Sequence, residues 1–175
     1  MSKIIVLRGN SGSGKSTVAD ALQKKIGRGT FLISQDYVRR EMLWVKDRPN
    51  NMAIDLLKHL VIYGNQNCEV SILDGILYTD IYSDLFCLIN ELYAGQTFAY
   101  YFDIPFEETL KRHSQKPISN KFGETEMRSW WREKDFLKNI NEKTIPKEMN
   151  VDDIVEMVYQ DLTGRDSFKI WEGTL

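Results

Sequence analysis

The chain of 175 residues is long enough for one well-packed domain and too short for two domains of ordinary size. Its formal net charge of −2 argues against a general nucleic-acid-binding protein, which usually needs a strong excess of basic residues. Cys68 and Cys87 have no metal-binding spacing, and no apolar run approaches the ~20 residues of a membrane span. The N-terminal apolar run is too short for a signal peptide, so we expect a cytoplasmic protein without membrane partners.

Short apolar segments alternate with amphipathic segments along the chain. Strands are predicted at residues 3–7, 30–34, 69–73 and 96–103, with a short fifth strand at 143–145. Helices are predicted at residues 17–26, 35–44, 52–63, 81–93, 106–113, 126–137 and 151–162. This alternation predicts an α/β protein of three layers, in which helices cover both faces of a five-stranded parallel sheet and ligands bind at the carboxyl ends of the strands.

The segment after the first predicted strand reads G-x-x-x-x-G-K-S, the pattern of a phosphate-binding P-loop. Its glycines permit close approaches that a Cβ atom would prevent, so backbone N–H groups can turn onto phosphate oxygens. We expect Lys15 to act on the β- and γ-phosphates of ATP as a catalytic cation, and the Ser16 hydroxyl to ligate Mg²⁺. A glycine turn that binds nothing would need neither the Lys-Ser pair nor three glycines. The residues predicted to bind the nucleotide are Gly9, Asn10, Ser11, Gly12, Ser13, Gly14, Lys15, Ser16 and Thr17.

A carboxylate, Asp36, follows the second predicted strand and therefore lies at the P-loop edge of the predicted sheet. We expect Asp36 to contact the phosphate acceptor and to accept the proton of its attacking hydroxyl. The alternative is a helix N-cap, a common role for aspartate at such a place. Arg39 lies one helical turn later and is predicted to bind an anionic group of the acceptor, whereas Arg40 is expected to point into solvent.

A second carboxylate, Asp74, ends the third predicted strand, as a Walker-B-type acid does. We expect it to hold Mg²⁺ with Ser16, or to orient the acceptor. The alternative is a turn aspartate that precedes Gly75. The functional interpretation is preferred because the carboxyl ends of strands face the ligand in this architecture.

Cationic residues flank a polar loop, residues 114–125, which is the segment most expected to move. We predict a helical lid at about residues 114–132, whose cations close over the triphosphate and stabilise charge in the transition state. These cations are Arg112 and Lys116 at the start of the loop, and Arg128 and Arg132 beyond it. The alternative is an ordinary solvated charged face.

Three segments resemble those of a known group of enzymes. The loop from Gly9 to Thr17 is similar to the phosphate loop of small P-loop kinases related to phage polynucleotide kinases, zeta toxins and chloramphenicol phosphotransferase. In polynucleotide kinases, the segment similar to Ile33-Ser34-Gln35-Asp36-Tyr37-Val38-Arg39 holds a catalytic aspartate and, three residues on, a substrate-binding arginine. Their strand-to-lid segment is similar to Tyr101-Phe102-Asp103-Ile104-Pro105-Phe106-Glu107-Glu108-Thr109-Leu110-Lys111-Arg112-His113.

The resemblance covers most of the chain up to about Leu162 and implies a fold similar to nucleoside-monophosphate kinases. Bacterial kinases, some described as uridine kinases, share the Phe122-Gly123-Glu124 and Trp130-Trp131-Arg132 type of lid. Two departures limit what the resemblance implies. Lys116 stands where polynucleotide kinases have a lid arginine, so the resemblance implies Arg128 or Arg132 as the catalytic cation, and Arg112, which matches the arginine at the start of their lid, as a nucleotide-binding residue. Leu73-Asp74-Gly75 differs from the end of their third strand. The resemblance therefore does not identify the acceptor.

We interpret residues 1–162 as one kinase domain and residues 163–175 as a C-terminal tail. The predicted reaction is the Mg²⁺-dependent transfer of the γ-phosphate of ATP to a hydroxyl of a small molecule such as a nucleoside, a metabolite or an antibiotic. A 5′-hydroxyl polynucleotide kinase stays open, although the weak net charge disfavours a nucleic-acid partner. A P-loop NTP hydrolase or a zeta-like toxin stays open as well.

Overall fold

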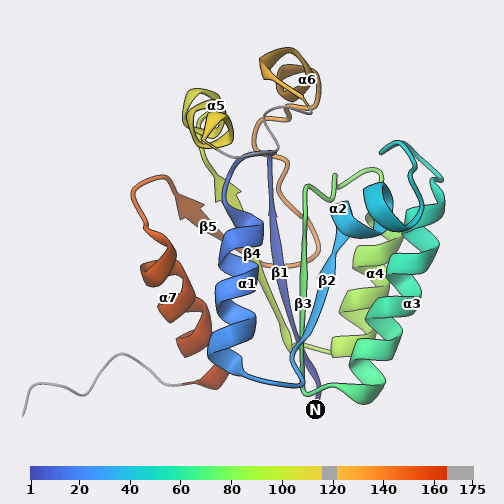
Figure 1. Cartoon of the computed structure of the whole chain (residues 1–175). Helices are drawn as coiled ribbons and strands as arrows, with labels where there is room; N and C mark the ends of the chain where they lie inside the picture. The colour runs from blue at the N-terminus through green and yellow to red at the C-terminus, as the bar shows by residue number, and fades with distance from the viewer. Residues whose placement is uncertain (116–121, 165–175) are drawn as a thin grey trace, which may run out of the picture.

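The computed structural model describes residues 1–115 and 122–164 of the chain (Figure 1). Its centre is a five-stranded parallel sheet with the order β2-β3-β1-β4-β5, which confirms the predicted sheet. The strands are β1 (Lys3–Gly9), β2 (Phe31–Ser34), β3 (Val70–Gly75), β4 (Thr97–Asp103) and β5 (Glu142–Pro146). Because all five strands run the same way, their carboxyl ends share one edge.

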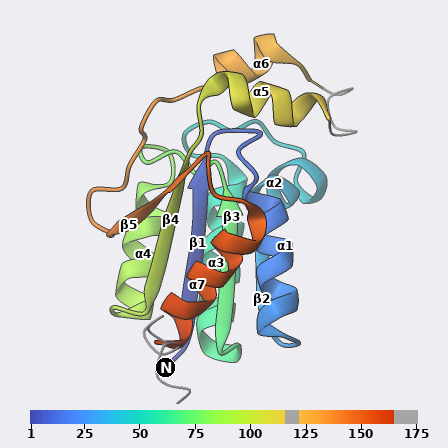
Figure 2. The ribbon, with the colours of Figure 1, turned by 90° about the vertical axis from the view of Figure 1, so that its left-hand side faces the viewer.

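Helices cover both faces of this sheet, which confirms the three-layer architecture (Figures 1 and 2). On one face lie α1 (Lys15–Ile26) and α7 (Val151–Thr163), and on the other lie α3 (Met52–Asn67) and α4 (Ser83–Tyr93). Two shorter helices, α5 (Phe106–Ser114) and α6 (Glu124–Ser129), lie beyond the carboxyl edge. In the part of the chain that the structure describes, no helix is long and apolar enough to cross a membrane.

The central strand β1 supports the P-loop by packing into both layers. Ile4 and Val6 belong to the apolar cluster beneath α3 and α4, and Ile5 and Leu7 to the cluster beneath α1 and α7. All four side chains are fully buried. Apolar side chains on both faces are typical of a parallel strand covered by helices. The loop that follows β1 therefore starts from one of the most firmly held parts of the molecule.

The pairing of the strands brings the two predicted carboxylates to the same place. In the register of the sheet, Asp74 of β3 is aligned with Leu7 of β1 and with Ser34 of β2. Since Asp36 follows Ser34 by two residues, the P-loop, Asp36 and Asp74 emerge from three adjacent strands. This proximity cannot be read from the order of the residues in the sequence. It follows from the order of the strands, which has β1 in the middle of the sheet.

The predicted helix at residues 35–44 is shorter and irregular. It comprises one turn, α2 (Gln35–Tyr37), followed by a π-helical turn, η1 (Val38–Met42). The N–H of Leu43 donates to the carbonyl of Val38, five residues earlier, and this wider ring marks the π-turn. Such turns are frequent at functional sites.

The predicted helix at residues 126–137 ends early, at Ser129. The following segment, residues 131–137, has no regular secondary structure, and we call it the strap. Its backbone N–H groups donate to side chains of other segments: Arg132 to Asn10 Oδ1, Asp135 to the hydroxyl of Tyr101, and Leu137 to Glu142 Oε2. These bonds, two of which span 122 and 34 residues of sequence, replace hydrogen bonds that a helix would make.

The predicted lid and tail are only partly described. Residues 116–121 of the lid, which include Lys116, lie outside the described residues, as do residues 165–175 of the tail. The described flanks of the lid are the helices α5 and α6. The division into a domain and a tail stays a prediction.

A substitution at Gly64 of α3 tests how closely this helix packs against the sheet. Alanine in a helix interior is normally about 1 kcal/mol more favourable than glycine. At Gly64, however, a Cβ atom would lie 2.4 Å from Ser71 Oγ and 3.1 Å from Phe31 Cδ1. Gly64→Ala should therefore lower the free energy of unfolding by about 1–3 kcal/mol in urea titrations.

Gln66→Ala, on the exposed side of the same helix, is the matched control and should change the free energy of unfolding by less than about 0.5 kcal/mol. A Gly64→Ala variant as stable as the wild type would contradict the close approach of α3 to β2 and β3.

Candidate active site

The P-loop runs from the end of β1 to the start of α1 and encloses the Lys15 side chain. Lys15 is 7% exposed, and its ammonium group donates to the carbonyl of Asn10 at 2.8 Å and to Ser13 Oγ at 3.1 Å. Ser13 is buried as well, whereas Ser11 is half-buried and Thr17 is exposed. The cation therefore lies inside the curve of the loop, where a phosphate group would bind.

Two glycines of the loop have conformations that other residues adopt only with strain. Gly12 has a φ of +78°, and a Cβ atom there would lie 2.6 Å from the carbonyl oxygen of Thr109 in α5. Gly14 has a φ of +104° and immediately precedes α1. The loop thus needs glycine both for its own turns and for its contact with the helix at the start of the lid.

The N-terminus of α1 has the properties of an anion site. Its N-cap, Gly14, offers no side-chain hydrogen bond, and its first turn contains no acidic residue. The helices α3 and α7, by contrast, are capped by the side chains of Asn51 and Asn150. The first N–H groups of α1 and the positive end of its dipole therefore face the loop with no carboxylate from the helix itself to neutralise them, which fits a phosphate.

Ser16 and Asp74 form the candidate metal site. Ser16 Oγ donates to Asp74 Oδ2 at 2.7 Å, and Asp74 is 3% exposed. Burial raises the pKa of Asp74, and the hydrogen bond from Ser16 and the charge of Lys15 oppose this rise. β3 continues through Gly75, so the interpretation of Asp74 as a turn residue is wrong. A serine hydroxyl beside a buried carboxylate is a suitable pair of oxygen ligands for Mg²⁺.

Asp36 is the second residue of α2, and its carboxylate is held by two arginines. Asp36 Oδ1 accepts from Arg39 Nη2 at 3.0 Å and from Arg40 Nε at 3.2 Å. The N-cap of α2 is Ser34, whose hydroxyl accepts the N–H of Tyr37, so the alternative of Asp36 as the N-cap is wrong. The expectation that Arg40 points into solvent is wrong too, because its guanidinium also lies 5.1 Å from the ring centroid of Phe122.

The segment around Asp36 contains two buried polar atoms that have no hydrogen-bond partner among the described residues, Gln35 Oε1 and Arg39 Nε. The amide of Gln35 donates from its nitrogen to Tyr82 and to Asp47. Arg39 donates from Nη1 to the carbonyl of Val45. An unpaired buried polar group costs roughly 1–3 kcal/mol, so these two atoms lower the stability of this segment.

The predicted lid cations have different surroundings. Arg112 Nη1 donates to the carbonyl of Ser13, a P-loop residue, at 3.1 Å. Arg128 pairs with Glu124, four residues earlier in α6, and lies over the ring of Phe106. The structure therefore brings the side chain of Arg112 to the P-loop, whereas that of Arg128 pairs within the lid.

Arg132 lies in the strap, where it pairs with Asp80 and lies over the ring of Tyr78, 4.0 Å from the ring centroid. The hydrogen bond from Arg132 holds the pKa of Asp80 below its ordinary value. Burial raises the pKa of Tyr78 to about 12, so this ring is a neutral platform for the guanidinium.

Sequence reasoning missed a buried charged network beneath the P-loop. Arg8, immediately before the loop, is fully buried and pairs with Asp135 of the strap and Glu142 of β5. The only sequence signal of this network was an arginine at the end of an apolar strand. An arginine that is buried there requires charged or hydrogen-bonding partners. Those partners are more than 120 residues away in the sequence, with separations of 127 and 134 residues.

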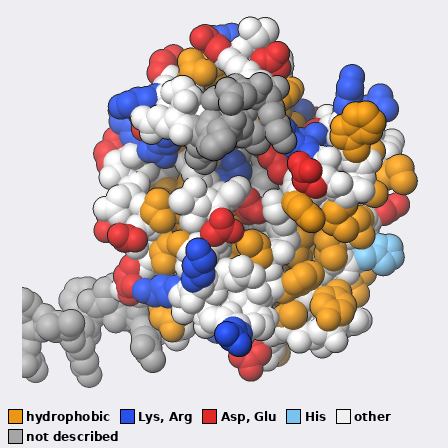
Figure 3. All heavy atoms as spheres, in the orientation of Figure 1, with side chains coloured by type: hydrophobic (Ala, Val, Ile, Leu, Met, Phe, Trp, Pro, Cys, Tyr) orange, Lys and Arg blue, Asp and Glu red, His pale blue; other side chains and the backbone are white. Residues whose placement is uncertain are grey.

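The type of exposed side chain differs from one side of the site to the other (Figure 3). Charged side chains of both signs gather over α5 and α6, whereas exposed apolar side chains gather on the side formed by η1 and α3. The large apolar residues that are exposed in α2, η1, α3 and the loop between them are Tyr37, Met42, Trp44, Met52 and Tyr63.

A strand, a glycine loop that encloses a lysine, and a helix with an uncapped N-terminus define a P-loop nucleotide-binding domain. The chain belongs to the AAA domain family AAA_33, whose model matches residues 4–137. No curated protein matches the chain.

Solved structures of several kinases share the fold. An APS kinase from Mycobacterium tuberculosis, in complex with AMPPNP and APS, is 19% identical, with a TM-score of 0.62 over 93% of this chain and 98% of that chain. A gluconokinase from Sinorhizobium meliloti is 16% identical, with a TM-score of 0.64 over 93% and 92%. A shikimate kinase from Acinetobacter baumannii, in complex with shikimate, is 16% identical, with a TM-score of 0.58 over 97% of both chains.

Replacing Asp74 by Asn should separate stability from metal binding. Burial disfavours the charged carboxylate, and an amide can still accept the hydrogen bond from Ser16, so Asp74→Asn should raise Tm by about 2–4 °C. The same change removes a charged oxygen ligand and should abolish most of the Mg²⁺ dependence of ATP binding. Thermal unfolding and calorimetric ATP titrations with and without Mg²⁺ measure the two effects.

Asp103→Asn, at the end of strand β4 of the same sheet, is the control and should change neither quantity. A lower Tm of Asp74→Asn together with unaltered Mg²⁺ dependence would mean that Asp74 has a structural role only.

Proposed function

We propose that this chain is an ATP-dependent kinase that transfers the γ-phosphate to a hydroxyl of a small molecule. The observation that carries the proposal is the position of Asp36. Its carboxylate lies at the sheet edge that also bears the P-loop and the Ser16–Asp74 pair. A carboxylate at this place can orient either water or an acceptor hydroxyl, and the two arginines beside it, which suit an anionic or polar acceptor, favour the hydroxyl.

The nucleotide side of the site offers groups for the β- and γ-phosphates and for Mg²⁺. The N–H groups of the loop and of α1 would hold the β-phosphate, and Lys15 would bridge the β- and γ-phosphates. Arg112, already in contact with the loop, would bind the nucleotide from the lid side. Ser16 and Asp74 would hold Mg²⁺, which neutralises charge on the phosphates, and the remaining ligands would be phosphate oxygens and water.

The acceptor would bind beside α2 and η1. Both arginines that hold Asp36 contact Oδ1, which leaves Oδ2 to accept the proton of the attacking hydroxyl. The guanidinium of Arg39, which already pairs with Asp36, would bind an oxygen substituent of the acceptor. This combination suits a small polar acceptor with several oxygen substituents.

The kinases that share the fold support a small acceptor, since one is named for gluconate and another is solved with shikimate. A phosphoryl-transfer screen with ATP should include both compounds, nucleosides, aminoglycosides and 5′-hydroxyl oligonucleotides. Phosphorylation of the oligonucleotide alone would favour a polynucleotide kinase, and release of phosphate without any acceptor would favour a hydrolase.

Lys15→Ala should leave the fold intact and weaken ATP binding and turnover at least tenfold, because it removes the cation enclosed by the loop. Calorimetric ATP titration and a turnover assay measure the effect. Lys24→Ala, an exposed lysine of the same helix, should behave as the wild type. Wild-type affinity and turnover in Lys15→Ala would rule out the P-loop as the nucleotide site.

Asp36→Asn should reduce phosphoryl transfer on the order of a hundredfold or more at near-normal ATP affinity and Tm, since it removes the base and keeps the shape. Steady-state kinetics with an acceptor from the screen measure the change. Asp55→Asn, on the exposed face of α3, is the control. Transfer at the wild-type rate in Asp36→Asn would show that Asp36 has no catalytic role.

A further inference from the structure

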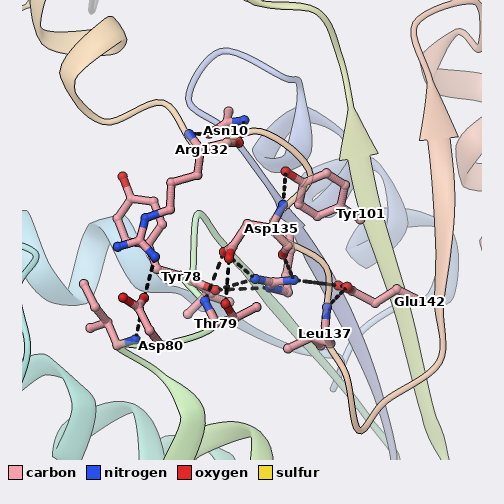
Figure 4. A network of polar contacts seen from close by, with 12 residues as sticks. Asn10, Tyr78, Thr79, Asp80, Tyr101, Arg132, Asp135, Leu137 and Glu142 are labelled. Carbon is pink, nitrogen blue, oxygen red and sulfur yellow. Dashed lines mark hydrogen bonds and ion pairs between the residues drawn. The ribbon is translucent and has the colours of Figure 1, made fainter.

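Arg8 of β1 links the strap to the strand that leads into the P-loop. Figure 4 shows two of its partners, Asp135 of the strap and Glu142 of β5, within this polar network. Arg8 Nη1 donates to both carboxylate oxygens of Glu142, at 2.9 and 3.1 Å, and to the carbonyl of Asp135 at 2.9 Å. Arg8 Nη2 donates to Asp135 Oδ2 at 3.1 Å, and Nε and Nη2 both donate to the carbonyl of Leu77. Removing one partner of a fully buried ion network leaves an uncompensated charge and strongly lowers the free energy of unfolding, so the network holds the strap firmly against β1.

A P-loop side chain fixes the strap at a second point. Asn10 Nδ2 donates to the carbonyl of Arg132 at 2.7 Å, and the N–H of Arg132 donates to Asn10 Oδ1 at 3.1 Å. The amide of Asn10 thus pairs with both backbone groups of one strap residue. The backbone of Arg132 is therefore held directly against the phosphate-binding loop.

The guanidinium of Arg132 is held far less firmly than its backbone. Its partner Asp80 has a side chain that is 63% exposed, and the side chain of Arg132 is 37% exposed. Exposed ion pairs contribute little, because water and salt screen them. A triphosphate bound in the loop presents a denser negative charge and several acceptor oxygens, so it can compete with Asp80 for this arginine.

Among the described residues, Arg128, the other candidate cation, makes no hydrogen bond to the loop, and its neighbour Met127 reaches Gly12 only through the end of its side chain. Arg128 lies on α6, pairs with Glu124 of the same helix and stacks on Phe106 of α5. Its hydrogen bonds and its stacking contact thus stay within the two lid helices. The two arginines therefore differ in how their backbones are held. The backbone of Arg132 is bonded to the P-loop, and a fixed backbone beside the bound phosphates favours charge stabilisation.

We propose that Arg8 and Asn10 are positioning residues that hold the backbone of Arg132 beside the P-loop, and that the side chain of Arg132 exchanges Asp80 for the γ-phosphate of ATP. Asp80 and Tyr78 hold the arginine while no triphosphate is bound. This inference rests on the proposed function, and it selects Arg132 over Arg128 as the catalytic cation.

Asp80→Asn removes the competitor for Arg132 and tests the exchange. Its effect on Mg²⁺-ATP and Mg²⁺-ADP affinity is measured by calorimetry in the wild-type and in the Arg132→Gln background. The loss of one negative charge acts in both backgrounds, so the difference between them reports on Arg132. We expect the ATP affinity to gain about two- to fivefold more in the wild-type background, with no such difference for ADP.

Glu124→Gln, tested in the same way with Arg128→Gln, is the matched control, because it releases the other arginine from an equivalent exposed pair. It should give no difference between ATP and ADP. A Glu124–Arg128 cycle that shows the preference for ATP, or an Asp80–Arg132 cycle that shows none, would overturn the assignment.

Asn10→Ala tests the positioning role. It should lower the preference for ATP over ADP toward that of Arg132→Gln, and it should raise hydrogen exchange in residues 131–137 with little change in Tm. Arg8→Lys keeps the charge but loses the planar fork, and should act in the same direction. If Arg8→Lys does not fold, Asn10→Ala alone tests the positioning role.

An unchanged preference for ATP in Asn10→Ala would overturn the positioning role. Failure of the wild type to bind ATP would instead reject the proposed function itself.

Discussion

The parallel pairing of β2, β3 and β1 is the constraint on which the site depends. It brings the ends of three strands to one edge of the sheet, although the P-loop, Asp36 and Asp74 are separated by up to 60 residues or so of sequence. The apolar residues of β1 pack into both layers and hold this edge in place. Each carboxylate then has a fixed distance to the loop, which phosphoryl transfer requires because its catalysis is mainly positioning and electrostatics.

The charges at this edge fall into two energetic classes. Asp74 and Arg8 are buried, so each must be compensated by neighbours, and removing a partner of such a charge typically costs about 3–5 kcal/mol. Arg132 and Asp80 are exposed, and pairs of this kind contribute only about 0–1 kcal/mol. The buried charges can therefore serve as rigid supports, whereas the exposed pair can rearrange when a ligand binds.

The elements of the sheet were predictable because their signals are local. Residues 3–7 are an apolar β-branched run, and the following G-x-x-x-x-G-K-S pattern identifies the phosphate loop. The helix predicted over residues 126–137 was too long because Arg132 and Asp135 lie at helical spacing but bind Asn10 and Arg8, far away in the sequence. The role of Arg8 was missed for the same reason, since only the folded chain brings its partners near. Arg40 differs, because Asp36 lies four residues away at helical spacing and only the contact with Phe122 depends on the fold.

The central claim is that a carboxylate and a P-loop on one sheet edge transfer phosphate to a hydroxyl. It is tested most directly by incubating the protein with Mg²⁺ and ATP labelled with ¹⁸O in the γ-phosphate, together with the low-molecular-mass fraction of a cell extract. Mass spectrometry then follows the label. The account predicts a labelled phosphate ester of a small hydroxyl compound that Lys15→Ala does not form. Label found only in inorganic phosphate would contradict it.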